Sequence, residues 1–416
     1  MAGKKINFLE EMIKGLRGEK GSRMAEALAY SEQGDRYFHS ADFKQAKRQY
    51  TKALILLKEI GFREGEGIAY CNLGNASYCL SNFKEAVEYH KEDLRVSKEA
   101  GNRAGEGRAY CNLGYAYHSQ GNFNKAIEYK KQDLNISKEV GDRLWEGMAY
   151  SNLGIANLSL GNLKQAMDYH KRHLSCAKEI GDRAGQGRAY GNLGNAYGCL
   201  GNFKQAIECH KQHLSIEKEV GHRVGEGMAY CNLGNAYHNL GNFKQAIEYQ
   251  EQSLGIAKEV ENRADESKTY RNLGNAYHSL GNFREAIEYH EKDLNITKEV
   301  GDRAGEGKAY RNLGNDYFRL GNFKQALEYQ EQDLSIAKEV GDRAGEGTAY
   351  GNLGNVYFSL GNFKEALEYH EQHLRIAKEL GDRAGRVGPM AISVLFITGG
   401  VNLKMLFSLT KNILVF

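Results

Sequence analysis

The 416-residue sequence has one proline, one tryptophan and no Cys-x-x-Cys pair among its seven cysteines. No apolar signal core follows residues 1–5 either. An odd set of unpaired thiols without a secretory leader is typical of a reduced compartment, so we expect a cytoplasmic protein. With a single proline and 49 glycines at regular spacing, the usual estimate of about three domains for this length does not apply until the periodicity is known.

Charge of one sign is not in excess. The formal net charge is +3 at pH 7, with 26% charged and 41% hydrophobic residues. This balance supplies ample material for a core and argues against a disordered chain. It also argues against a strongly basic chain that binds nucleic acid or membranes.

The sequence repeats itself with a period of 40 residues. Nine units fit between residues 21 and 380, and a tyrosine marks the same position in each of them: Tyr30, Tyr70, Tyr110, Tyr150, Tyr190, Tyr230, Tyr270, Tyr310 and Tyr350. Units that agree so closely meet the same packing environment, which indicates a solenoid.

Each unit is predicted to form two amphipathic helices of about 17 residues. In the unit 181–220, apolar residues recur at spacings of three and four in both halves. Gly201 ends the first helix in a left-handed conformation, and Asn202 with Gln205 begins the second as a capping box. Gly181 ends the preceding helix, and Asp182 caps the next one. A lone helix pair cannot bury its apolar face without a neighbouring unit.

The two ends differ from the repeats. Residues 1–20 place Leu9, Met12, Ile13 and Leu16 on one face, which favours an N-terminal capping helix over a helix lying on a membrane surface. Residues 381–416 are a non-repeat apolar tail. Its stretch 387–403 reaches the lower length limit for a membrane span but contains Pro389 and several glycines. A docked helix, a membrane anchor and an artefact of the encoded sequence stay open for this tail.

The unit 101–140 carries Tyr110, Leu113, Gly114, Tyr117, Phe123 and Ala126. This spacing resembles the tetratricopeptide repeat signature, which implies an all-α, right-handed superhelix of antiparallel helix pairs. Such repeats are ordinarily about 34 residues long. The 40-residue variant resembles the Partner of Inscuteable and G-protein-signalling-modulator family and is similar to long tetratricopeptide repeat protein 28-like arrays. Neither a GoLoco-type segment nor a caspase-like domain follows the repeats, so G-protein regulation and proteolysis are not expected.

Asparagines recur on the first helix of each unit, one residue before and two after the buried leucine. We expect them to line the concave side of the superhelix, where the resembling family binds extended segments of partner proteins. An amide side chain offers both donors and an acceptor to a peptide backbone. The alternative is that they bond the neighbouring helix. Tyr115 and Ile155 interrupt the series, which comprises Asn72, Asn75, Asn112, Asn152, Asn192, Asn195, Asn232, Asn235, Asn272, Asn275, Asn312, Asn315, Asn352 and Asn355.

Basic residues accompany these asparagines and become denser between residues 261 and 340. They predict a preference for acidic peptide ligands, through charge-assisted hydrogen bonds. The alternative is that they are solvated charges balanced by nearby glutamates. The set is Arg108, Arg188, Lys268, Arg271, Lys308, Arg311 and Arg319.

Catalytic, metal and cofactor chemistry is not predicted. Three His-x-x-His pairs occur, such as His170 with His173, but no third ligand recurs in register. Because His90, His170 and their equivalents occupy an aromatic packing position of the signature, we interpret them as helix-interface residues. No phosphate-binding loop and no nucleophile with a partnered base is present, so we expect neither an enzyme nor a cofactor.

The sequence thus predicts a non-enzymatic scaffold that holds extended, acidic segments of partner proteins. A structural spacer or self-assembling repeat protein is the alternative. An RNA-binding helical repeat would need a more basic inner face. Membrane contact is expected only through residues 387–403.

Overall fold

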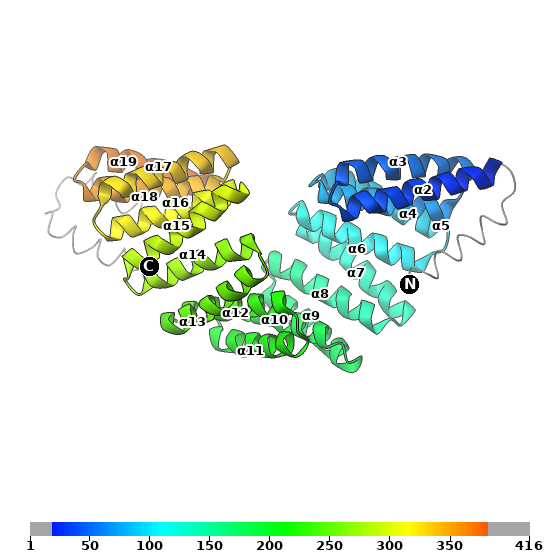
Figure 1. Cartoon of the computed structure of the whole chain (residues 1–416), viewed down its shortest axis with the longest axis horizontal. Coiled ribbons are helices and arrows are strands. Elements are labelled where there is room, and N and C mark those ends of the chain that lie inside the picture. Colours follow the sequence, from blue (N-terminus) through cyan, green and yellow to red (C-terminus); the bar gives the residue numbers. More distant parts are fainter. Residues whose placement is uncertain (1–18, 382–416) are drawn as a thin grey trace. The chain divides into compact units, whose positions relative to one another are not determined.

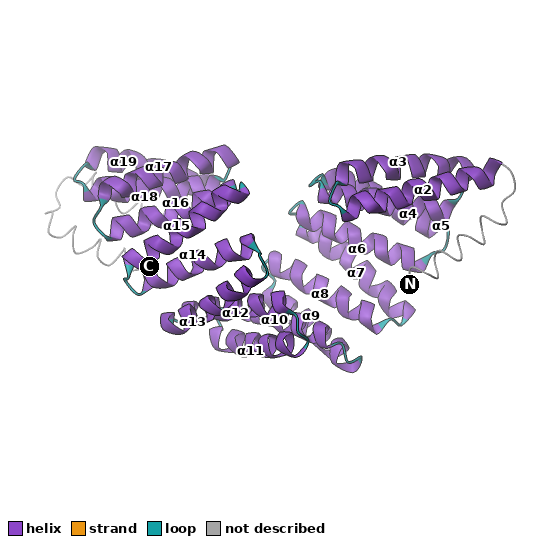
Figure 2. Cartoon of the chain, viewed as in Figure 1, coloured by secondary structure: helices purple, strands orange, loops and turns teal. Residues whose placement is uncertain are grey.

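A computed structural model describes residues 19–381, and every regular element in that range is an α-helix (Figure 2). The chain divides into two compact units, Met1–Ile216 and Glu217–Phe416. The first contains α2 (Glu19–His39), α3 (Phe43–Ile60), α4 (Arg63–Cys79), α5 (Phe83–Glu99), α6 (Arg103–Ser119), α7 (Phe123–Val140), α8 (Arg143–Ser159), α9 (Leu163–Glu179) and α10 (Arg183–Cys199) (Figure 1). The division falls inside α11 (Phe203–Glu219). The second contains α12 (Arg223–Asn239), α13 (Phe243–Glu259), α14 (Arg263–Ser279), α15 (Phe283–Val300), α16 (Arg303–Arg319), α17 (Phe323–Val340), α18 (Arg343–Ser359) and α19 (Phe363–Glu379).

The predicted all-α fold of repeated, antiparallel helix pairs is confirmed. An even-numbered helix packs most extensively on the odd-numbered helix that follows it, for example α12 on α13 and α16 on α17. The odd-numbered helix then packs on the next even-numbered one. The expected capping helix and the expected tail lie outside the described residues, except for the few that border the repeats.

The turns form as the sequence predicts. Gly181 and Gly201 have φ values of 71° and 77°, in the left-handed region that glycine adopts without strain. Asp182 Oδ1 accepts a hydrogen bond of 2.9 Å from the backbone N–H of Gly185. Asn202 Oδ1 does the same for Gln205 at 3.3 Å. These two helices therefore begin with a side-chain cap that accepts a hydrogen bond from the backbone N–H three residues later.

The interface within a helix pair depends on the contact of a glycine with a larger residue. The His170 ring is fully buried against Gly154. A Cβ at residue 154 would lie 2.3 Å from that ring, so only glycine allows the approach. Burial lowers the pKa of His170 to about 4, which keeps the ring neutral. The interpretation of these histidines as helix-interface residues is confirmed by the same burial of His90, His210, His290 and His370.

Within each of the two compact units, even-numbered helices of successive repeats also touch one another, as α4 touches α6 and α14 touches α16. Side chains of these helices consequently come close to side chains of the equivalent helix one repeat away. Between residues 19 and 381, no helix combines the length and the apolar character that a membrane crossing requires.

Candidate functional site

Each even-numbered helix from α4 to α18 presents one polar stripe, which we name the amide stripe. In α14 the stripe consists of Lys268, Asn272, Asn275 and Ser279, separated by four, three and four residues. This spacing keeps the four side chains on one helix face. The intervening Leu273 is fully buried toward the rest of the repeat. The asparagine series from the sequence occupies the two middle positions of the stripes, except that Tyr115 and Ile155 replace the second asparagine in α6 and α8. We name the asparagines at the first of these positions the first row and those at the second the second row.

Asparagines of the first row link neighbouring repeats. Their amide nitrogens donate to a side chain of the preceding repeat. Within residues 19–381 five such bonds occur: Asn112 to Cys71 Sγ (3.5 Å), Asn152 to Cys111 Sγ (3.7 Å), Asn192 to Ser151 Oγ (3.3 Å), Asn272 to Cys231 Sγ (3.5 Å) and Asn352 to Gln330 Oε1 (3.1 Å). Sulfur is a weak acceptor. The first row therefore has a structural task, but Asn152 is its only buried member.

Asparagines of the second row are less engaged. Asn235 and Asn315 accept hydrogen bonds from the buried Gln250 and Gln330, at 2.9 and 3.0 Å. In the part of the chain that the structure describes, the side chains of Asn195, Asn275 and Asn355 form no hydrogen bond. These amides are partly or fully exposed, so their donors and acceptors can reach a ligand.

A recess of about 250 Å³ opens on the amide stripe between α12 and α14. Asn235, Asn272 and Asn275 line it together with His238 and Gln250. Gln250 is 1% exposed, and its Oε1 has no hydrogen-bond partner. Buried polar atoms are ordinarily paired. The recess is therefore lined by amide side chains, including one with an unpaired acceptor, which suits a ligand with backbone-like donors and acceptors.

The basic residues fall into two groups. Arg108, Arg188, Lys268, Lys308 and Arg319 belong to the amide stripe. Arg108 bonds Asp93 at 3.1 Å, and Arg188 lies 3.5 Å from Asp182. Arg319 lies over the Phe283 ring, and Lys268 lies beside the Cys231 thiol. Lys308 forms no ion pair with any residue in 19–381.

Arg271 and Arg311, which the sequence predicted to meet acidic ligands, are instead paired with carboxylates of their own repeat. Their side chains point into the helix pair, where each guanidinium makes two hydrogen bonds, of 2.8 and 3.0 Å, to the carboxylate of Asp293 or Asp333. Both carboxylates are buried. A guanidinium bound in this two-pronged manner has little capacity left for a ligand. The cations available to a ligand between residues 261 and 340 are therefore Lys268, Lys308 and Arg319.

These arginines belong to an interior pair that changes from repeat to repeat, which we name the variable pair. It joins an even-numbered helix to a residue 22 positions later on the following odd-numbered helix. Glycine occurs with histidine at Gly191/His213 and Gly351/His373, where the ring fills the space above the glycine. The other pairs are Cys71/Asp93, Cys111/Asp133, Ser151/His173, Cys231/Ser253, Arg271/Asp293 and Arg311/Asp333. Comparing residues 22 apart across repeats would have found this covariation in the sequence.

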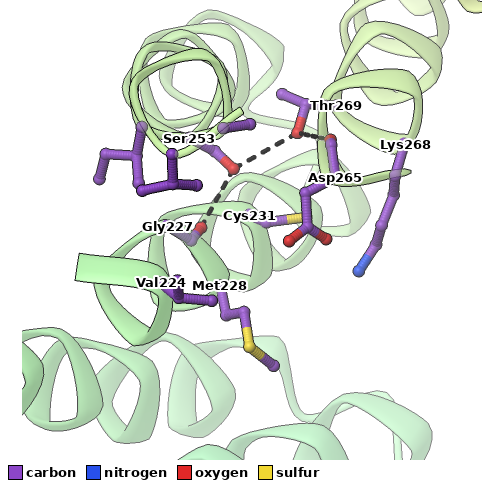
Figure 3. Close-up of a pocket in the computed structure, with 11 residues that line it drawn as sticks. Val224, Gly227, Met228, Cys231, Ser253, Asp265, Lys268 and Thr269 are labelled. Atoms are coloured by element: carbon purple, nitrogen blue, oxygen red, sulfur yellow. Dashed lines mark hydrogen bonds between the residues drawn. The ribbon is translucent and has the colours of Figure 1, made fainter. Parts of the chain in front are cut away.

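At the variable pair Cys231/Ser253, polar side chains form a hydrogen-bonded cluster between neighbouring helices (Figure 3). Ser253 Oγ donates to the Gly227 carbonyl at 3.0 Å, and Thr269 Oγ1 donates to the Asp265 carbonyl at 2.7 Å. The space between these residues is about 10 Å³, enough for one water molecule at most. Burial raises the pKa of the Cys231 thiol, which disfavours a reactive thiolate.

No group of three or more His, Cys, Asp or Glu side chains in residues 19–381 is arranged to hold a metal ion. All seven cysteines are free thiols. Burial raises the pKa of Cys71 to about 11 and that of Cys111 to about 12. The described site thus presents hydrogen-bonding groups and cations to a ligand.

Repeated helix pairs with a polar stripe along one set of helices define an α-helical repeat protein. The tetratricopeptide repeat profile matches residues 65–139, 105–179, 145–219, 225–299 and 305–379. The chain belongs to the tetratricopeptide repeat family. The comparison with curated proteins gave no significant match.

Solved structures with the same fold share little sequence with this chain. A STAND-class signal transduction ATPase with a tetratricopeptide repeat sensor, from Pyrococcus horikoshii, is 20% identical over 81% of this chain (TM-score 0.59). The aligned region is 53% of that protein. The quorum sensor NprR from B. thuringiensis is 17% identical over 84% of this chain and 97% of its own (TM-score 0.59). A Rap protein complexed with Competence and Sporulation Factor is 14% identical over 86% and 99% (TM-score 0.55).

Proposed function

We propose that this protein is a non-enzymatic interaction scaffold that binds extended segments of partner proteins along the amide stripe. The observation that carries the proposal is the recess between α12 and α14. There Gln250 Oε1 is buried without a partner, and Asn275 has free donors and an acceptor. An extended peptide offers the complementary N–H and C=O groups at every residue.

Charge gives the proposal its direction. Lys268 and Lys308 are exposed on neighbouring stripes, one repeat apart. Arg319 lies on the same stripe as Lys308, and its guanidinium is over an aromatic ring instead of a carboxylate. These three cations favour segments that carry Asp or Glu. We also propose that the protein is cytoplasmic and that its nine repeats run continuously from residue 21 to 380. Within the tetratricopeptide repeat proteins, we propose kinship with the Partner of Inscuteable or tetratricopeptide repeat protein 28-like proteins.

A solved structure with a similar fold supports the proposal. The Rap structure with a similar fold was solved with Competence and Sporulation Factor bound, so a helical repeat of this shape is compatible with a ligand. At 14% identity that likeness concerns the fold alone.

The test is selection of binders from a phage-displayed library of random, unstructured peptides on the full chain. Selected peptides are then measured against Asn235→Ala/Asn272→Ala/Asn275→Ala. We expect affinity to fall roughly tenfold or more, because several net hydrogen bonds of about 1 kcal/mol each are lost. The matched control is Gln212→Ala/Gln252→Ala/Gln332→Ala, which removes exposed amides of odd-numbered helices.

Charge is tested separately with Lys268→Glu/Lys308→Glu/Arg319→Glu. This variant should weaken acidic peptides and leave neutral ones unchanged. Failure to select any peptide would overturn the proposal. So would equal losses in the amide variant and its control.

A further inference from the structure

The repeats 101–140 and 141–180 depart from the other units at residues that meet in space. Tyr115 replaces the stripe asparagine, and Lys130 replaces the histidine or glutamine of the helix interface. Trp145, the single tryptophan, stands where six other repeats have glycine. All three lie around the seam formed by α6, α7 and α8. In a chain of near-identical units, such a concentration of differences marks a specialised place.

A recess of about 290 Å³ opens at this seam. Trp145, Met148, Cys111 and Asp133 are among the residues that line it. The equivalent space, which Cys231, Ser253 and Asp265 line, is only about 10 Å³. Figure 3 shows the residues around it. The opening at α6–α8 is therefore a property of these particular residues, and its size suits one large side chain rather than a water molecule.

Trp145 is held firmly as one wall. Its indole Nε1 donates to Asp133 Oδ1 at 2.8 Å, and its backbone N–H donates to Asp142 Oδ1 at 2.9 Å. The ring lies against the backbone of α6, where a Cβ at Gly107 would come within 2.2 Å of it. A fixed indole is a suitable surface for stacking an aromatic ring.

Asp133 lines the recess and has an unsatisfied acceptor. The residue is 1% exposed, and its Oδ2 has no hydrogen-bond partner among the described residues. Leaving a buried carboxylate oxygen unpaired is costly. A ligand that donates one hydrogen bond to Oδ2 would recover that cost.

The charges around the recess are already balanced. Lys130 lies beside Asp133 on α7, with its ammonium 3.8 Å from the centre of the Tyr115 ring. Arg108, on α6, is bound to Asp93. The lining residues of α8 carry no charge. A cationic ligand would add an unpaired buried charge, and an anionic one would meet Asp133, so a neutral donor fits best.

We propose that the α6–α8 recess binds a tyrosine side chain of a partner protein, with its ring against Trp145 and its phenol donating to Asp133 Oδ2. This proposal deepens the scaffold function and rests on it, because the recess adjoins the amide stripe at Asn112 and Asn152. It gives the partner segment an anchor residue as well as acidic character.

The single tryptophan provides the measurement. The full chain is titrated with N-acetyltyrosinamide while Trp145 fluorescence is recorded. Excitation is at the red edge of the tryptophan absorption band, where tyrosine does not absorb. The two matched probes are N-acetylphenylalaninamide, which lacks the hydroxyl, and N-acetyl-O-methyltyrosinamide, whose ether oxygen can accept a hydrogen bond but cannot donate one. We expect a saturable change that needs roughly tenfold more of either matched probe, since a hydrogen bond to a carboxylate is lost.

Asp133→Ser should abolish this preference while keeping the fold, because the chain itself has Ser253 at the equivalent position. Asp133→Asn is the second, isosteric variant, and it should reduce the preference. Asp168→Ser is the control, since it removes an exposed carboxylate of α9. Burial raises the pKa of Asp133 to about 6, so the preference of the unmodified protein should weaken as the pH falls through that value.

Equal response to the three probes would overturn the proposal, as would an unchanged preference in both Asp133 variants. Peptide selection on the amide stripe is an independent measurement. A negative titration with successful selection rejects the tyrosine anchor alone. Failed selection with a positive titration rejects the extended-segment function instead.

Discussion

Replacing both residues of one variable pair by those of another should largely preserve the stability of the repeat, whereas replacing either residue alone should lower it. Arg311→Gly and Asp333→His together copy the pair Gly351/His373 of the next repeat. The local surroundings match, because Gly307 and Gly347 hold the equivalent place beside each pair. Favourable coupling would show that Arg311 serves the helix interface.

The magnitude follows from the contacts. Asp333 is 1% exposed and accepts both of its hydrogen bonds from Arg311, whose side chain is about one-fifth exposed. Breaking a fully buried ion pair by removing one partner costs about 3–5 kcal/mol. Partial exposure of the arginine lowers this to roughly 2–3 kcal/mol, and a glycine within a helix adds about 1 kcal/mol. The double variant should lose only about the glycine cost, which leaves a coupling of at least about 2 kcal/mol.

Hydrogen exchange followed by mass spectrometry is the appropriate assay, because long repeat arrays do not unfold in two states. Opening free energies of peptides from α16 and α17 are compared in the four proteins of the cycle. The control cycle uses Arg172→Gly and Asp168→His, an exposed i,i+4 pair of α9. Its coupling should stay below about 0.5 kcal/mol. A coupling at Arg311/Asp333 no larger than in this control would refute the reasoning.

The pH dependence of the single variant gives a second check. Burial raises the pKa of Asp333, although Arg311 acts in the opposite direction. A carboxyl whose pKa is higher in the folded state binds extra protons there, so its contribution to stability falls as the pH rises. Without Arg311 the folded pKa rises further. The loss caused by Arg311→Gly should therefore be larger at pH 8 than at acidic pH.

Three further predictions concern single residues. Lys130→Gln should raise the free energy of unfolding by roughly 1–3 kcal/mol at neutral pH, because burial lowers the pKa of this ammonium. That gain should shrink as the pH rises toward the unfolded lysine pKa, as urea titrations by circular dichroism would show. Gly154→Ala should cost roughly 1–3 kcal/mol through contact with the rigid His170 ring, whereas Gly198→Ala, which meets no atom within 4 Å, should stabilise α10 by about 0.5–1 kcal/mol in hydrogen exchange. Glu261→Gly should slow exchange at the end of α13, because Glu261 has a φ of 53°.

The repeating helix pairs could be predicted because their signals are local. Spacings of three and four, a cap such as Asp182 and a turn glycine such as Gly201 each act within a few residues. Forty-residue periodicity then showed that every unit meets the same neighbours. The placement of His170 at a helix interface followed from the same register.

The partners of Arg271 and Arg311 could not be read in this way. A helical pattern shows which side of a helix is polar, but both arginines lie at the border between the stripe and the buried face. Whether such a side chain turns outward or inward depends on what stands opposite, here Asp293 and Asp333 on another helix. Likewise, Asn272 reaches Cys231 only because successive even-numbered helices touch, which depends on how the repeats stack.

Near-identical repeats offer a peptide several equivalent binding registers, and the residues that depart from the repeat can favour one of them. The helices α4 to α18 present eight similar stripes, and a peptide that bound them equally would place only about one-eighth of its population in any single register. A tenfold preference for one register, worth about 1.4 kcal/mol, would place more than half of the peptide there. One hydrogen bond from a tyrosine to Asp133 is of that size. The departures at Lys130 and Trp145 are thus where a uniform scaffold can acquire a defined orientation for its ligand.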